Sequence, residues 1–203
     1  MSRQNLNYSA SEYINNMQKI LLIGSPGSGK STIAMELGKY LNLPVLHLDA
    51  LYWTPNWERV DSQEVGEKLH KLLQQEKWIM DGPDPENWDS HFQAADTLIF
   101  LDYHPSLCIY RALKRLFQFR GSSRPDLPEH TVEIDWDTLK GIWYYPQAVR
   151  PLVLGKMRQY QENRQVLIFR KPQELQAYIH NINTKINCGQ NQKKSQQLSS
   201  DFI

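Results

Sequence analysis

The stretch Ile20–Gly38, ILLIGSPGSGKSTIAMELG, places a glycine-rich loop between an apolar run and a segment with helical spacing. Residues 24–31, GSPGSGKS, fit the pattern G-x-x-x-x-G-K-[ST] at every fixed position. Glycines let the backbone turn its N–H groups toward phosphate oxygens with no Cβ in the way. The alternative is an ordinary tight turn, but a chance match in about 200 residues has a probability on the order of 1%. The sequence therefore predicts a phosphate-binding loop.

The residue types in this loop also indicate a nucleotide with its metal. The helix that begins near Lys30 directs the partial positive charge of its N-terminus toward bound phosphate. In this motif the lysine reaches the β- and γ-phosphates, and the hydroxyl that follows, here Ser31, binds Mg²⁺. ATP and Mg²⁺ are therefore the expected cofactors. The predicted nucleotide-binding residues are Gly24, Ser25, Pro26, Gly27, Ser28, Gly29, Lys30, Ser31 and Thr32.

Short, continuous apolar runs predict the strands of a buried parallel sheet. They are KILLIG (19–24), LPVLHLD (43–49), WIMDG (78–82), TLIFLD (97–102) and QVLIFR (165–170). Between them, apolar residues recur at helical spacing in 31–41, 61–76 and 105–119. Strands that alternate with helices imply crossover connections, so the expected fold class is α/β, with a five-stranded parallel sheet between two layers of helices.

One domain, residues 18–182, accounts for these elements. Residues 1–17 are mostly polar and are expected to form an N-terminal extension. Residues 183–203 are rich in Gln, Asn, Ser and Lys, contain almost nothing to bury, and are expected to be a disordered tail.

Composition argues against several classes of protein. With 23 Lys+Arg against 22 Asp+Glu, the formal net charge of +1 gives no reason to expect direct nucleic-acid binding or an anionic membrane as partner. No apolar run approaches the roughly 18 residues that a membrane span needs, and the N-terminus lacks the apolar core of a secretory signal. The two cysteines, Cys108 and Cys188, fit no CxxC pattern, so the expected location is the reducing cytoplasm.

Three acidic residues, Asp49, Asp81 and Asp102, each end an apolar run. They are expected at the carboxyl edge of the sheet, where ligands of open α/β folds bind. Asp81 is predicted to hold a water of Mg²⁺, because Gly82 beside it permits close approach. Asp49 is predicted to face the acceptor, where a carboxylate can orient or deprotonate a hydroxyl or phosphate. Asp102 is the less favoured metal candidate, and any of the three could instead cap a turn.

A group of basic residues follows the fourth run. Arg111 and Arg115 are four residues apart and share one helix face, whereas Arg120 and Arg124 flank a Gly-Ser-Ser segment where a mobile loop could begin. Guanidinium groups neutralise the charge that spreads over a transferring phosphoryl group. The four arginines are therefore predicted to be catalytic and to form a lid over ATP. The alternative is a solvated basic face.

Together these motifs resemble the adenylate-kinase-like nucleoside phosphate kinases of the P-loop NTPase class, and more closely the bacterial DNA topology modulation (FlaR-like) proteins. The resemblance spans about residues 19–180. It implies that the strand of Asp81 lies beside the strand of the loop, that Arg111 lies near the adenine or phosphates, and that the other arginines neutralise charge from the lid side. It rests on the successive segments LPVLHLDALYW, WIMDG, TLIFLD, RGSSRPD and LKGIWYYP.

The sequence departs from true adenylate kinases directly after Asp81. Where those enzymes read D-G-F-P-R, this chain has DGPDP (81–85), so the arginine that would hold an acceptor phosphate is missing. The predicted function is Mg·ATP-dependent transfer of the γ-phosphate to a small acceptor that the sequence does not identify, with Lys30 and Asp49 among the catalytic residues. The alternative is an ATP-gated regulatory protein with little or no kinase activity.

The aromatic residues and histidines near these motifs are interpreted as packing residues. Tyr52, Trp53 and Trp57 could stack on a base or sugar, but packing of a short helical insert onto the sheet is the preferred explanation. His47 is expected to pack beside the sheet edge. The residues expected in the core, or in the groove of a helix that covers the site, are Trp136, Trp143, Tyr144 and Tyr145.

Overall fold

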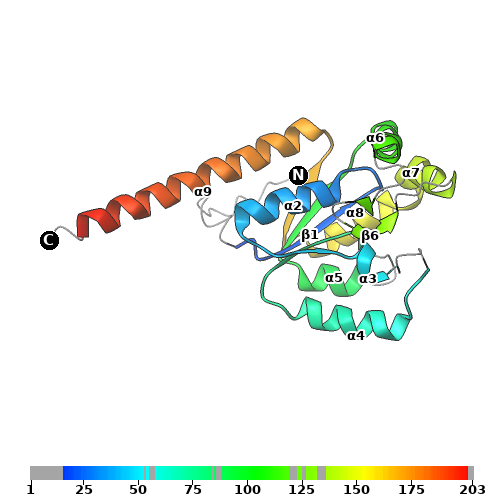
Figure 1. The fold of residues 1–203 in the computed structure, drawn as a ribbon, viewed down its shortest axis with the longest axis horizontal. Helices are drawn as coiled ribbons and strands as arrows, with labels where there is room; N and C mark the ends of the chain where they lie inside the picture. The colour runs from blue at the N-terminus through cyan, green and yellow to red at the C-terminus, as the bar shows by residue number, and fades with distance from the viewer. Residues whose placement is uncertain are drawn as a thin grey trace.

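The structure is a computed structural model that describes residues 16–52, 54, 58–83, 85, 88–118, 123–124, 127–131 and 136–200, without the side chains of 123–131, 187 and 189–200. Its centre is a five-stranded parallel sheet in the order β2-β3-β1-β4-β7 (Figure 1). The five predicted runs all form strands, and the α/β fold class is confirmed. The strands are β1 (Lys19–Gly24), β2 (Val45–His47), β3 (Trp78–Asp81), β4 (Thr97–Leu101) and β7 (Gln165–Phe169).

The sheet contributes alternate side chains to two separate clusters of buried residues. In β1, Ile20 and Leu22 belong to one cluster, whereas Leu21 and Ile23 belong to the other. Because both faces are covered, nearly every position of the central strands must be apolar, which explains the continuous apolar runs in the sequence. The strand of Asp81 pairs directly with the loop strand, with Leu22 opposite Asp81, as expected.

Helices form the two outer layers (Figure 1). One cluster takes buried side chains from α2 (Lys30–Leu41), α6 (Pro105–Gln118), α7 (Trp136–Ala148) and α9 (Pro172–Ser200). The other takes them from α3 (Asp49–Tyr52), α4 (Ser62–Leu73), α5 (Trp88–Ala94) and α8 (Arg150–Tyr160). A small antiparallel hairpin of β5 (Ser123–Arg124) and β6 (Leu127–Thr131) lies between α6 and α7 in the chain. Within the described residues, no helix is long and apolar enough to cross a membrane.

The boundaries of the structured core differ from the expected 18–182. Met17, placed in the extension, is 2% exposed and belongs to the core. At the other end, α9 runs on to Ser200, through residues that the composition assigned to a disordered tail. The buried Leu175, Ile179 and Ile182 anchor its first turns on the sheet. Extending an anchored helix adds one hydrogen bond per residue without a new nucleation cost, and Gln and Lys are good helix formers. The helix therefore continues where apolar residues stop, and projects from the domain (Figure 1).

Asp102, the third acidic strand-end residue, is engaged by helix α8. Arg150 Nε and Nη2 donate to its two carboxylate oxygens at 2.7 and 2.9 Å, and Arg170 lies 3.8 Å away. The Asp102 side chain is 9% exposed. Both oxygens of this carboxylate therefore take part in a bidentate ion pair, which gives strong charge-assisted hydrogen bonds.

We expect Arg150→Met to lower the free energy of unfolding by about 1.5–3 kcal/mol, because it leaves a nearly buried carboxylate without its two charged hydrogen bonds. Urea denaturation measures the change. The matched control is Lys140→Met, which breaks the fully solvated pair with Asp137 and should change the free energy by less than about 0.5 kcal/mol. Equal effects of the two substitutions would contradict this assignment.

Candidate nucleotide site

The glycine-rich loop joins β1 to α2 in a conformation that requires glycine. Gly27 and Gly29 have φ angles of 77° and 97°, in the left-handed region. A Cβ on Gly27 would lie 2.2 Å from the carbonyl oxygen of Cys108 in α6, so the loop backbone lies directly against that helix. Gly29 is the N-cap of α2, without a side chain to cap the helix, and the first turn carries no acid. The N-terminus of α2 thus keeps its partial positive charge for a ligand.

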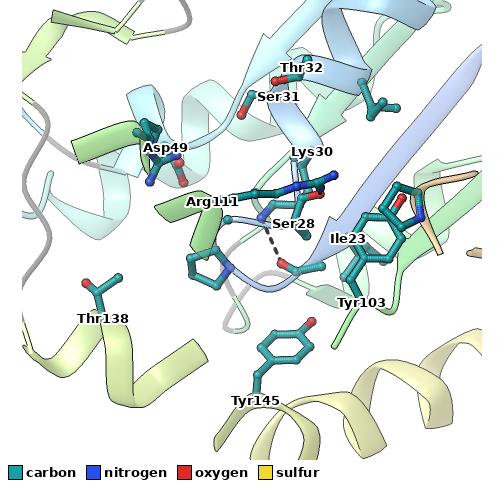
Figure 2. Close-up of a pocket in the computed structure, with 18 of the residues that line it drawn as sticks. Ile23, Ser28, Lys30, Ser31, Thr32, Asp49, Tyr103, Arg111, Thr138 and Tyr145 are labelled. Atoms are coloured by element: carbon teal, nitrogen blue, oxygen red, sulfur yellow. Dashed lines mark hydrogen bonds between the residues drawn. The ribbon is translucent and has the colours of Figure 1, made fainter. Parts of the chain in front are cut away.

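A cavity of about 840 Å³, here called the loop cavity, opens beside this loop (Figure 2). Its volume falls in the range of small-molecule sites. It brings together segments that are far apart in the sequence. Among its lining residues are Gly24 and 26–32 of the loop and α2, Asp49 and Gly82 after β2 and β3, Tyr103 after β4, Arg111, Lys114 and Arg115 of α6, Thr138 and Tyr145 of α7, and Pro172 and Gln176 of α9.

Lys30 is the first residue of α2, and its side chain turns back onto the loop. Its ammonium donates to the carbonyl oxygens of Gly24 and Ser25 at 2.9 and 3.1 Å. Burial lowers the pKa of Lys30, whereas the carboxylates of Asp49 and Asp81 raise it. The two acidic residues therefore lie close enough to act on the lysine, and they offset part of the cost of burying its charge.

Two hydroxyl groups of the loop lack partners. Ser25 and Ser28 are 4% and 1% exposed, and among the described residues neither Oγ has a hydrogen-bond partner. A buried polar group without a partner costs free energy, so native proteins rarely leave one unless a ligand or water meets it. The N-terminus of α2, an ammonium and two hydroxyls without partners among the described residues lie at one place, and this combination fits a polyphosphate.

Of the four predicted arginines, the structure describes the side chains of two, Arg111 and Arg115. Arg111 lies across the loop, with Asp49 to one side and Tyr103 to the other (Figure 2). It donates to the Ser28 carbonyl at 2.9 Å and stacks on the Tyr103 ring, 5.6 Å from its centroid. Arg115 also lines the loop cavity. Arg120 lies outside the described residues, and for Arg124 only the backbone, in β5, is described, so their predicted roles in a lid remain predictions.

The two remaining carboxylates have different surroundings. Asp49 lines the loop cavity, and a Cβ on Gly82 would lie 2.9 Å from its Oδ1, with Gly82 at a φ of 74°. Because Gly82 has no side chain, the Asp49 carboxylate can lie close to its backbone. Asp81 is 3% exposed and lies behind this surface, where its Oδ1 is 2.7 Å from Nδ1 of His47. The residues described include no cluster of three His, Cys, Asp or Glu that could bind a metal by itself.

Several residues of the site were not predicted from the sequence. The Cys108 carbonyl, the Tyr103 ring and α9 residues all reach the loop through the fold, and no local pattern signals them. His47 was expected only to pack beside the sheet edge, whereas its Nδ1 lies against Oδ1 of Asp81. Burial raises the pKa of the Cys108 thiol, which keeps it protonated and unreactive.

The aromatic residues were predicted correctly only in part. Tyr52 is buried in the core as expected, whereas Trp53 and Trp57 lie outside the described residues. The expectation for α7 was mostly wrong: Trp136, Trp143 and Tyr144 are 77%, 55% and 59% exposed. Of this group only Tyr145 turns inward. Its ring centroid is 6.5 Å from that of Phe100, and it lines the loop cavity.

Comparisons with known proteins add little to this geometry. No protein-family model matches the chain, and no curated protein matches it either. Similar solved structures include a gluconokinase from Sinorhizobium meliloti 1021, 14% identical, covering 91% of this chain and 98% of that one, with a TM-score of 0.44. Another is a sugar kinase from Janibacter sp. HTCC2649, 13% identical, covering 83% and 91%, with a TM-score of 0.46. These likenesses are too distant to bear on the reaction, and the resemblance to DNA topology modulation proteins stays a prediction.

Gly27→Ala should lower the free energy of unfolding by about 2 kcal/mol or more, since the new methyl group meets backbone and the φ angle is strained. The matched control is Gly66→Ala in α4, where an added Cβ meets nothing within 4 Å. That change should raise the free energy of unfolding by about 0.5–1 kcal/mol, because alanine is the better helix former. Chemical denaturation measures both, and a Gly27→Ala protein as stable as the wild type would show that the loop does not lie against α6.

Proposed function

We propose that the chain binds Mg·ATP in the loop cavity and transfers the γ-phosphate to a small acceptor that carries a hydroxyl or phosphate group. The observation that carries this proposal is that the glycine-rich loop and Asp49 line the same cavity. A nucleotide on the loop and an acceptor beside Asp49 would therefore share one cavity.

The loop residues supply binding and charge neutralisation for the polyphosphate. The Lys30 ammonium, now bonded to loop carbonyls, is the cation best placed to interact with the β- and γ-phosphates. The unpartnered hydroxyls of Ser25 and Ser28 can donate to phosphate oxygens. Arg111 is already fixed by Ser28 and Tyr103, so it can neutralise developing charge without losing further freedom.

The residues present also fit Mg²⁺. This ion keeps several waters and is usually held by one or two carboxylates together with substrate phosphates, so it needs no preformed cluster of protein ligands. Ser31, which lines the loop cavity, and Asp81, through water, would hold it. Bound there, the ion would draw charge from the phosphate oxygens.

On the acceptor side, Asp49 is the residue we assign to the chemistry. Its carboxylate lies over Gly82 in the cavity wall and is close enough to raise the pKa of Lys30. It can orient an acceptor hydroxyl and accept its proton as the oxygen bonds to the γ-phosphorus, the bond from that phosphorus to the β–γ bridging oxygen breaks, and ADP leaves.

The nucleotide assignment is tested by Lys30→Ala. Isothermal titration with Mg·ATP should show affinity reduced about 10- to 100-fold, the equivalent of losing a charge-assisted hydrogen bond to phosphate. Lys39→Ala, in the last turn of the same helix and exposed, is the control and should bind as the wild type does. Unchanged affinity in Lys30→Ala would contradict the proposal.

The reaction is tested by measuring ADP formation with nucleosides, nucleotides and small hydroxy compounds as acceptors. One class should stimulate turnover strongly, and with it Asp49→Asn should lower kcat about 100-fold or more while ATP still binds. Asp137→Asn, an exposed carboxylate of α7, serves as control. Slow hydrolysis that no acceptor stimulates would instead favour the ATP-gated regulatory protein.

A further inference from the structure

A histidine–carboxylate pair lies behind the loop, where β2 and β3 end. His47 Nδ1 and Asp81 Oδ1 are 2.7 Å apart, and the two residues are directly opposite in the parallel register. Their side chains are 17% and 4% exposed. The Leu48 N–H donates to the Asp81 carbonyl at 3.1 Å. The backbone pairing of β2 with β3 therefore holds these two residues next to each other.

Asp81 lies close to the loop although it does not line the cavity. Asp81 ends β3 directly opposite Leu22 of β1, two residues before the loop begins at Gly24. Since Oδ1 is engaged by His47, Oδ2 is the oxygen through which Asp81 can interact with a ligand of the loop.

We propose that His47 is a positioning residue that holds Asp81 by Oδ1 and so leaves Oδ2 to accept from the hydration shell of the nucleotide-bound metal. The inference rests on the function proposed above. Without the imidazole, the carboxylate is free to rotate, and neither oxygen keeps a fixed direction. Partners that orient a metal's ligands commonly change metal affinity 10- to 100-fold.

The test separates binding of the metal from binding of the nucleotide. With the non-hydrolysable analogue AMPPNP at saturation, Mn²⁺ is titrated and free Mn²⁺ is measured by electron paramagnetic resonance. His47→Leu should weaken Mn²⁺ binding about 10- to 100-fold. His47→Asn, whose amide can donate from near the Nδ1 position, should restore most of this loss. The affinity for AMPPNP in EDTA should be the same in all three proteins.

Four further variants control the test. His47→Gln places its amide near Nε2 instead and should behave as His47→Leu does, which covers a failure of the leucine variant to fold. His70→Leu removes an exposed histidine of α4, whose Nε2 lies 2.8 Å from Nε2 of Gln74 at the C-cap of the same helix, and should have no effect. Asp81→Asn should weaken Mn²⁺ binding as His47→Leu does, and the double variant should lose no more, because His47 acts through Asp81.

The outcomes distinguish this inference from the proposed function. Wild-type Mn²⁺ affinity in both His47→Leu and His47→Gln, or an equal loss in His47→Leu and His47→Asn, would overturn the positioning role and leave nucleotide binding standing. Failure of the wild-type protein to bind AMPPNP, with or without Mn²⁺, would overturn the proposed function and this inference with it.

Discussion

The backbone contact between Gly27 and the Cys108 carbonyl is the constraint on which the site depends. It joins the loop to α6 with no room for a side chain, and Arg111, one turn further along α6, donates to the carbonyl of Ser28. The loop is thus held from outside before any ligand arrives. A binding loop that is already ordered does not lose conformational entropy when phosphate binds, so more of the interaction energy appears as affinity.

This contact also sets the electrostatics of the cavity. Packing α6 onto the loop brings Arg111 and Arg115 to the same cavity as Lys30. Burial is the largest cause of the lowered pKa of that lysine, and Asp49 and Asp81 each raise its pKa by more than Arg115 lowers it. The described residues that line the cavity nevertheless include four cations, Lys30, Arg111, Lys114 and Arg115, against one carboxylate, Asp49. A polyphosphate would bring several negative charges to this excess of cations. Phosphate oxygens can accept from the hydroxyls of Ser25 and Ser28, which have no partner among the described residues, and can pair with these cations, so the cavity suits the kind of ligand that the loop sequence indicates.

The sequence was informative wherever the determinant was local. The apolar runs predicted the five strands, and the loop motif predicted that α2 starts near Lys30, because backbone conformation and burial act over a few residues. The position of β3 beside β1 was instead implied by the family resemblance. Contacts between residues far apart in the chain could not be predicted from these local patterns. That His47 meets Asp81, or that Tyr103 lies beneath Arg111, depends on strand order and helix packing. The extent of α9 was misjudged for a different reason: composition reports what can be buried, whereas an anchored helix can continue without burial.

The two carboxylates near Lys30 also show how the fold can separate chemical roles that the sequence leaves equivalent. Asp49 and Asp81 each end an apolar run, yet only Asp49 lines the cavity, with Gly82 giving it space. Asp81 is 3% exposed, and its Oδ1 lies 2.7 Å from Nδ1 of His47. A carboxylate in the cavity wall can exchange a proton with a small molecule, whereas a nearly buried one held by imidazole keeps a fixed orientation and suits a structural part in cation binding. The difference arises from the register of β2 and β3, which sets His47 opposite Asp81 and leaves Asp49, two residues later, to start α3 beside the cavity.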